Sequence, residues 1–400
     1  MEIIDRPTYT TAINKWLGKG LVIVLTGQRR IGKSMCLSLI ARQQELNGNN
    51  VVLIDKEDHS FDKIKTSDDL NAYIESKFQN GKRNIILIDE VQEIVEFEHS
   101  VRSWIKKTDT DVIITGSNAR MLSSDLSTKL SARYIEIPIH SLSYQEFLVF
   151  NSLEDSDSSL EKYLTFGGLP YLRIIGFDDK KLVSDYINSV YDTVVLKDIV
   201  KREQIRNVPF LLNLGKFVSD NIGKQLSPNS IMKFMKSQGE TVSAPLILSY
   251  LTYFVDSYLA YRVYRYDIHG KSLLENNEKY YFEDLGIRNM LVHSTNAGDI
   301  EKRIENVVYM HLLRNGWNVY VGQLYNTEID FVAEKENQVI YIQVTYLIMT
   351  EETEKREFGN LLAINNNHPK MLISMNPLNT DSNYQGIRHI HLREFLKQDW

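Results

Sequence analysis

The chain has 400 residues, a length at which proteins usually divide into two or three domains. Hydrophobic residues make up 43% of it and charged residues 24%, which excludes a chain too polar to fold. The formal net charge is -6, so the protein has no strong overall positive field with which to hold nucleic acid non-specifically.

The opening residues and the single cysteine indicate the compartment. The sequence MEIIDRPTYTT carries charges of both signs and contains no apolar signal region. No apolar run in the chain approaches the ~20 residues needed to span a bilayer. Cys36 can form no intrachain disulfide, which fits a reducing compartment. We therefore expect a soluble, cytoplasmic protein with no membrane partner.

Short apolar runs recur through the first third of the chain and predict a parallel sheet. Each run is continuous and does not alternate with polar residues, so both faces of each strand are expected to be buried. The stretches between the runs are long enough for crossover helices. The five runs are 21–26, 51–55, 85–89, 112–115 and 134–139.

The segment GQRRIGKS matches the phosphate-loop pattern G-x-x-x-x-G-K-[ST] in full, between an expected strand and an expected helix. Its glycines allow a tight turn in which successive backbone N–H groups face an anion at a helix N-terminus. In this pattern Lys33 contacts the β and γ phosphates, and Ser34 offers a hydroxyl to Mg²⁺. The pattern predicts an ATP site built from Gly27, Gln28, Arg29, Arg30, Ile31, Gly32, Lys33, Ser34 and Met35.

The apolar run at 85–89 ends in two acids. Asp89 is expected at the carboxyl edge of the sheet, beside the phosphate loop, where it would hold Mg²⁺ partly through water. Glu90 follows it and could orient the attacking water as a general base. The alternative is a strand that ends in two solvated acids.

The run at 112–115 is followed by small polar residues. Ser117 or Asn118 is expected near the γ phosphate, where either could sense the phosphate or hold the water. Either residue could instead cap the next helix, and the two roles are compatible.

The segment 21–138 resembles an AAA-type ATPase. The chain as a whole resembles a large prokaryotic family of such ATPases that carry a C-terminal restriction-endonuclease-like domain. The resemblance implies an α/β fold with a P-loop core over 1–142, a helical lid over 143–212 and the nuclease-like α/β domain over 295–400. The motifs that carry it are GQRRIGKS, LIDEVQ, ITGSNA, SARY, PIHSLSYQEF, FGGLP, KYYFEDLGIRN, EIDFVA and YIQV.

The resemblance also implies two roles that the spacing does not show. Arg133 occupies the place of an arginine finger, which would act on the nucleotide of a neighbouring subunit in a homo-oligomer. Pro170 belongs to the turn of the lid that borders the nucleotide. The alternatives are a surface arginine at the start of a strand and a simple helix break.

Residues 213–290 have the pattern of a winged helix, with short helices followed by two strand-like runs. The helix expected over 244–256 contains no Lys or Arg, which is unfavourable for reading bases in the major groove. A protein partner and a DNA partner both stay open for this segment.

The C-terminal order of helix, three strands, helix and strand is that of a restriction-endonuclease-like core. The resemblance assigns Glu305 and Asp330 to the nuclease motif. Gln343 stands where the motif has its second carboxylate, and Thr345 stands where it has a lysine. A neutral amide binds Mg²⁺ more weakly than a carboxylate does. We therefore expect a degenerate, inactive nuclease-like site.

The leading hypothesis is a Mg²⁺-dependent, ATP-hydrolysing switch that acts on an unknown macromolecular partner. One alternative is a DNA-acting enzyme in which an ATPase and a nuclease are coupled. Another is a nucleotide-binding scaffold or antitoxin-like module with little turnover.

Overall fold

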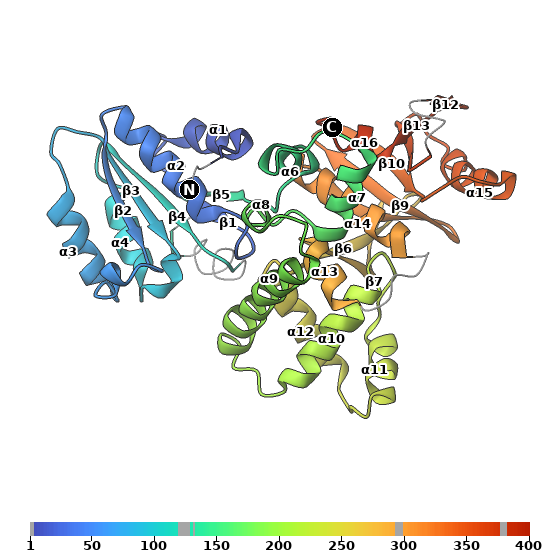
Figure 1. The fold of residues 1–400 in the computed structure, drawn as a ribbon, viewed down its shortest axis with the longest axis horizontal. Coiled ribbons are helices and arrows are strands. Elements are labelled where there is room, and N and C mark those ends of the chain that lie inside the picture. The colour runs from blue at the N-terminus through green and yellow to red at the C-terminus, as the bar shows by residue number, and fades with distance from the viewer. Residues whose placement is uncertain (1–3, 119–128, 131–132, 293–298, 377–381) are drawn as a thin grey trace. The chain divides into compact units, whose positions relative to one another are not determined.

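The computed structural model describes residues 4–118, 129–130, 133–292, 299–376 and 382–400. The chain forms two compact units (Figure 1). The first unit contains Met1–His140 and Asp256–Tyr258, and the second contains Ser141–Val255 and Leu259–Trp400. Within the described ranges, no helix has both the length and the apolar character needed to cross a membrane.

The first unit contains a five-stranded sheet in the order β2-β3-β4-β1-β5, and every neighbouring pair is parallel. This confirms the parallel sheet predicted from the continuous apolar runs. The strands are β1 (Val22–Thr26), β2 (Asn50–Asp55), β3 (Asn84–Asp89), β4 (Thr110–Thr115) and β5 (Tyr134–Pro138).

Helices cover both faces of this sheet, which is why its strands are apolar on both sides. Ile86 and Ile88 of β3 pack in one cluster with Leu70 of α3 and Val101 of α4. The opposite face is covered by α2, which contacts β2, β3 and β4 and packs against α1. The helices are α1 (Pro7–Trp16), α2 (Lys33–Leu46), α3 (Ser67–Lys77) and α4 (Phe97–Trp104), with short 3-10 turns η1 (His59–Phe61) and η2 (Val91–Glu93).

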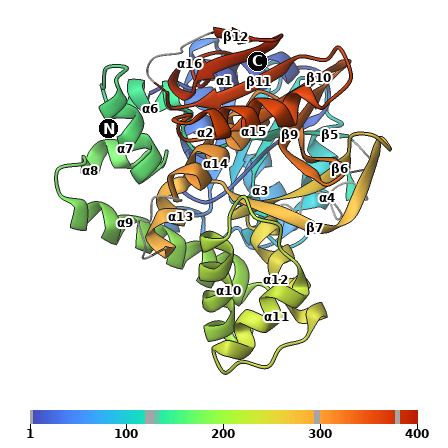
Figure 2. The ribbon, with the colours of Figure 1, turned by 90° about the vertical axis from the view of Figure 1, so that its right-hand side faces the viewer.

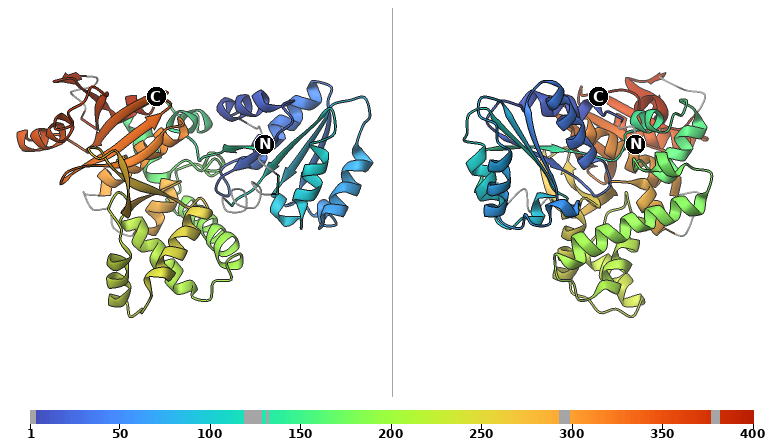
Figure 3. Two further views of the ribbon diagram at one scale, coloured as in Figure 1. Left: turned by 180° about the vertical axis from the view of Figure 1, so that it is seen from behind. Right: turned by 60° about the vertical axis from the view of Figure 1, so that its left-hand side comes forward.

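The second unit begins with helices, as expected. Helices α9 to α12 gather on one side of the unit, away from its C-terminal strands (Figures 1 and 3). The helices are α6 (Tyr144–Phe150), α7 (Asp157–Phe166), α8 (Leu172–Ile175), α9 (Lys180–Thr193), the π-helix η4 (Val194–Lys201), α10 (Val208–Asp220), α11 (Pro228–Ser237) and α12 (Ala244–Asp256).

The rest of the second unit is built on an eight-stranded mixed sheet in the order β12-β13-β11-β10-β9-β8-β6-β7. The elements expected after residue 300 are present in the expected order. They are α14 (Asp299–Arg314), β8 (Asn318–Leu324), β9 (Thr327–Lys335), β10 (Gln338–Val344), α15 (Glu351–Leu362) and β11 (Lys370–Ser374), followed by β12 (Ser382–Tyr384), β13 (Ile387–His391) and α16 (Leu392–Phe395).

Two strands from residues 213–290, where the sequence predicted a winged helix, belong to this same sheet. Figure 2 shows β6 (Ala260–Asp267) and β7 (Ser272–Phe282) as a long hairpin. β6 pairs with β8 in parallel, with Arg265 opposite Val321. The sheet therefore continues across the boundary expected between residues 290 and 295.

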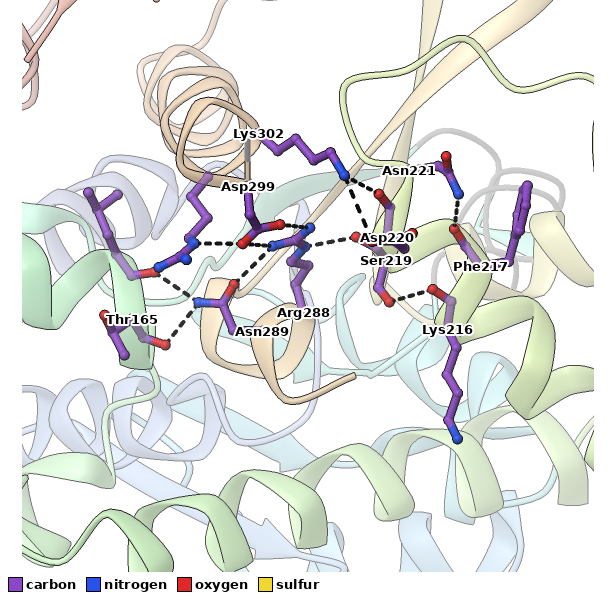
Figure 4. A network of polar contacts seen from close by, with 12 residues as sticks. Thr165, Lys216, Phe217, Ser219, Asp220, Asn221, Arg288, Asn289, Asp299 and Lys302 are labelled. Carbon is purple, nitrogen blue, oxygen red and sulfur yellow. Dashed lines mark hydrogen bonds and ion pairs between the residues drawn. The ribbon is translucent and has the colours of Figure 1, made fainter. Parts of the chain in front are cut away.

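A buried arginine ties several helices of the second unit together (Figure 4). Arg288, on α13 (Leu285–Leu291), forms two hydrogen bonds of 2.6 and 2.9 Å to the carboxylate of Asp299 at the start of α14. Its Nε donates to the carbonyl of Ser219 in α10 at 2.8 Å. Burial disfavours the charge on Asp299, but hydrogen bonds and charge from Arg288 and Arg303 hold its pKa below the usual value.

Two of the quoted motifs pack against each other in the second unit. The N–H of Gly168, in FGGLP, donates to the carboxylate of Asp284, in FEDLGIRN, at 2.7 Å. A Cβ on Gly167 would lie 2.3 Å from an oxygen of Asp284, so the close approach requires glycine. Burial raises the pKa of Asp284 to about 6, although hydrogen bonds from backbone N–H groups oppose that rise.

Candidate nucleotide-binding site

The predicted site residues of the first unit gather at the carboxyl edge of its sheet. β4 lies between β3 and β1, and all three strands run parallel, so their carboxyl ends meet at one edge. Loop 27–32 follows β1, Asp89 ends β3 and Glu90 follows it. Ser117 and Asn118 follow β4, and both are buried.

The phosphate loop has the backbone that its glycines predict. Gly27 has φ +132° and Gly32 has φ +103°. A Cβ on Gly27 would lie 2.2 Å from the carbonyl oxygen of Ile139 and 2.6 Å from Cδ1 of Ile31. Gly32 is the N-cap of α2, and as a glycine it offers no side chain to cap that helix. Such a helix N-terminus is a favourable place for a phosphate.

The ammonium of Lys33 lies within this loop. Its Nζ donates to the carbonyl oxygens of Gly27 and Gln28, at 2.8 and 2.7 Å. The side chain is buried, with 5% of the residue exposed. The loop therefore fixes a positive charge beside its own backbone, as a phosphate site requires.

The side chain of Gln28 is a second sign that the loop fits a polar ligand. Gln28 is fully buried, and neither polar atom of its amide has a hydrogen-bond partner among the described residues. A buried polar group without a partner destabilises a fold by about 1–3 kcal/mol. A ligand with hydrogen-bonding atoms would remove that penalty.

Asp89 and Ser34 offer oxygen atoms to a hard cation such as Mg²⁺. Burial raises the pKa of Asp89, while hydrogen bonds from Ser34 and Thr115 act in the opposite direction. The hydroxyl of Thr115 donates to Oδ1 of Asp89 and accepts the N–H of Glu90 at 2.9 Å. Thr115 was missed in the sequence, although a threonine that ends a buried apolar strand is a usable signal.

Glu90 is held by Arg29 and Gln92, two contacts that the sequence analysis did not predict. It is buried, has φ +49° and lies 3.5 Å from the guanidinium of Arg29. The amide of Gln92 donates to the same carboxylate oxygen. Arg29 also lies 3.5 Å from Glu57, which is on the segment after β2. The carboxylate of Glu90 is thus positioned by a basic residue of the phosphate loop itself.

The remaining predicted residues lie elsewhere or face solvent. Arg30 and Met35 are exposed parts of the loop and of α2. Arg133 is exposed and directly precedes β5, where its carbonyl accepts the N–H of Val22. It therefore lies at the amino edge of the sheet. Pro170 belongs to the second unit, and its role at the nucleotide stays a prediction.

The structure also brings the predicted nuclease-like residues together in the second unit. The N–H of Asp330 donates to the side-chain oxygen of Gln343 at 3.4 Å. The negative charge of Glu305 raises the pKa of Asp330. Lys279, Tyr281 and Glu328 surround the two acids, and the sequence analysis had assigned none of the three. We call Lys279, Tyr281, Glu305, Glu328 and Asp330 the Glu305 cluster.

Comparisons with known proteins agree with this architecture. Residues 19–148 match the model of a family described as an AAA domain. With the parallel sheet and the loop between β1 and α2, this match makes the first unit an AAA-type P-loop domain. Residues 157–298 match a domain of unknown function (DUF8612).

Over its length the chain belongs to the same family as an uncharacterized protein of Haemophilus influenzae. The two are 32% identical over 404 residues, which cover 99% of each chain. An uncharacterized protein of Methanocaldococcus jannaschii is 27% identical over 350 residues, 84% of this chain and 76% of the relative. A solved structure, the Walker-type ATPase of Pyrococcus abyssi, is similar with a TM-score of 0.49 and 15% identity, over 72% of this chain and 96% of that one.

Proposed function

We propose that the chain binds ATP with Mg²⁺ at its phosphate loop, hydrolyses it and acts as a nucleotide-driven switch on a macromolecular partner. The observation that supports this best is the geometry of the loop. Lys33 is held against the loop's own carbonyls, and Ser34 forms a hydrogen bond to Asp89 at the same edge of the sheet.

Binding rests on the loop and the first turn of α2. Backbone N–H groups of 27–35 donate hydrogen bonds to the phosphate oxygens, and Lys33 adds a positive charge. Ser34 and Asp89 are the residues that would hold the metal. When bound, Mg²⁺ would neutralise part of the charge on the β and γ phosphates.

Hydrolysis uses the residues after β3 and β4. Glu90 orients the attacking water and accepts its proton, and Ser117 or Asn118 holds the water or the γ phosphate. Arg133 acts on the nucleotide of a neighbouring copy, and Pro170 borders the nucleotide from the lid. The burial of Glu90 beside Arg29 favours turnover over a scaffold that only binds nucleotide.

The switch is divided as the sequence suggests. The core is 1–142 and the lid 143–212, while the winged-helix-like part 213–290 and the restriction-endonuclease-like part 295–400 share one eight-stranded sheet. The packing of FGGLP on Asp284 supports the proposal, because it joins the lid directly to residues beside the eight-stranded sheet within the second unit. The partner recognised by these domains is DNA or a protein.

The test is nucleotide binding by Lys33→Ala. At a hundredfold excess over Kd, MgATP should stabilise the wild-type protein by about 2.7 kcal/mol, seen as a rise in melting temperature. Lys33→Ala should show no such rise, because the charge inside the loop is lost. Lys63→Ala removes an exposed lysine of the same unit and should respond as wild type does. An undiminished response in Lys33→Ala would refute the assignment of the loop.

A further inference from the structure

In the Glu305 cluster, the acids already surround a cation, the ammonium of Lys279. The nuclease-like resemblance does not account for it. Lys279 is on β7 and only 1% of it is exposed. Its Nζ lies 3.0 Å from Oε1 of Glu305, on α14, and 2.7 Å from Oε1 of Glu328, on β9. The ammonium thus bridges Glu305, one of the two acids of the nuclease-like motif, and its neighbour Glu328.

Further donors contact the three carboxyl groups of the cluster. The hydroxyl of Tyr281 donates to the same oxygen of Glu305 that Lys279 contacts. The amide of Gln225 donates to the second oxygen of Glu328 at 2.7 Å. The backbone N–H of Val344 donates to Asp330 at 2.7 Å. A divalent cation that used these oxygen atoms would have to displace the donors that contact them.

The loop between α10 and α11 packs against Glu305 and Glu328 of the cluster. A Cβ built on Gly223 would lie 2.6 Å from Oε2 of Glu305, so the loop's backbone packs directly on that carboxylate. Gln225, on the same loop, covers Glu328. A metal with its water ligands needs room that this loop occupies.

The charges agree with the geometry. Burial opposes the charge on Lys279, but Glu305, Asp330 and Glu328 raise its pKa above the usual value, so it stays an ammonium. Burial and the charge of Glu305 raise the pKa of Asp330 well above its usual value, although Lys279 and the N–H of Val344 oppose this.

We infer that Lys279 is the resident cation of the Glu305 cluster, and that this site takes an ammonium where a nuclease would take a divalent metal. The residues therefore do not fit a metal, and the unit does not cleave nucleic acid there. The inference goes beyond the proposed ATPase and does not depend on it, because every residue involved belongs to the second unit.

The first arm of the test measures Mn²⁺ binding to the full-length, nucleotide-free protein by electron paramagnetic resonance. The wild-type protein and its Glu305→Gln variant should bind the same amount of Mn²⁺. Any Mn²⁺ that binds near the phosphate loop is present in both proteins and cancels in the comparison. Mn²⁺ that is bound by wild type and lost in Glu305→Gln would overturn the inference. Loss of ATP binding in other variants would leave this arm unaffected.

The second arm removes the ammonium. Lys279→Met should lower the melting temperature at neutral pH by roughly 10 °C, because it leaves the partly buried carboxylates of Glu305 and Glu328 without their counter-ion. Millimolar Mn²⁺ should not restore that loss, because the loop between α10 and α11 still packs on Glu305 and occupies the room that a metal with its water ligands needs. Recovery of the wild-type melting temperature in Mn²⁺ would overturn the inference. Lys236→Met, at an exposed position on α11, is the matched control and should behave as wild type.

A third variant covers the case in which Lys279→Met does not fold. Lys279→Met/Glu305→Gln/Glu328→Gln removes the cation and both of its charged partners, and should fold without any metal. If the triple variant is no more stable than Lys279→Met, or if Lys279→Met melts as wild type does, Lys279 is not the cation of the cluster.

Discussion

Glu90 is the residue that the proposed ATP hydrolysis depends on most directly. It follows the buried strand β3 in the left-handed backbone region, and its carboxylate is held by Arg29 and Gln92. A general base needs both position and an ionised carboxylate. The arginine beside it fixes that position, because its guanidinium lies 3.5 Å from the carboxylate of Glu90.

Glu90→Gln should therefore trap nucleotide. The amide keeps the shape of the side chain but cannot accept the proton of the water, so turnover should fall roughly 10²- to 10⁴-fold while ATP stays bound. Phosphate release and retention of labelled ATP on a filter measure the two effects. Glu93→Gln, which changes an exposed acid three residues on, should turn over normally. Wild-type turnover in Glu90→Gln would remove this residue from the role of base.

At the scale of elements, the network of Arg288 determines how α10, α13 and α14 are held together (Figure 4). Arg288 is fully buried, and Asp299 faces it with both oxygens. Removing one partner from such a pair leaves a buried charge without compensation, which is far more harmful than losing a surface ion pair.

Arg288→Met should lower the free energy of unfolding of the second unit by about 3–5 kcal/mol. Urea unfolding followed by circular dichroism measures the change. Lys302→Met is the matched control, because Lys302 reaches Asp220 at 3.8 Å from a more exposed part of the same network, and it should lose less than about 1 kcal/mol. Equal losses in the two variants would contradict the structural role given to Arg288.

The same scale shows what the sequence could and could not reveal. The parallel sheet was predictable because each strand is a continuous apolar run, and the phosphate loop because its spacing is local. The pairing of β6 with β8 was not, because Arg265 and Val321 are far apart in the chain and neither strand encodes its neighbour. Lys279 was missed for the same reason. Its partners Glu305 and Glu328 lie on α14 and β9, far along the chain, and only the fold brings them to it.

At the scale of the whole molecule, Arg133 is at the wrong end of its own sheet to serve its own nucleotide. β5 pairs with β1 in register, from Val22 opposite Tyr134 to Thr26 opposite Pro138. Arg133 is level with Leu21, six residues before the phosphate loop, and therefore lies about 20 Å from the loop along the strand direction, at ~3.3 Å per residue. The proposed arginine finger can act only between copies of the chain.

Mixing two inactive variants tests this. Arg133→Ala and Lys33→Ala should each lose nearly all ATPase activity, the first because an arginine finger contributes about 10³- to 10⁵-fold. In an equal mixture, a protomer with an intact phosphate loop meets a neighbour with an intact Arg133 at about a quarter of the contacts of a cyclic assembly. Steady-state ATPase measurements should then show activity that neither variant has alone. No recovery, at concentrations where wild type is active, would leave Arg133 as a surface residue.

The continuity of the eight-stranded sheet determines which fragments of this protein can be expressed as folded pieces. A fragment that begins at residue 295 would lack β6 and β7, and the edge of β8 that normally pairs with β6 would be left with bare backbone donors and acceptors. Such an edge recruits strands from other molecules. Expressed by itself, the C-terminal piece should therefore aggregate, whereas a fragment that keeps the hairpin retains its natural border.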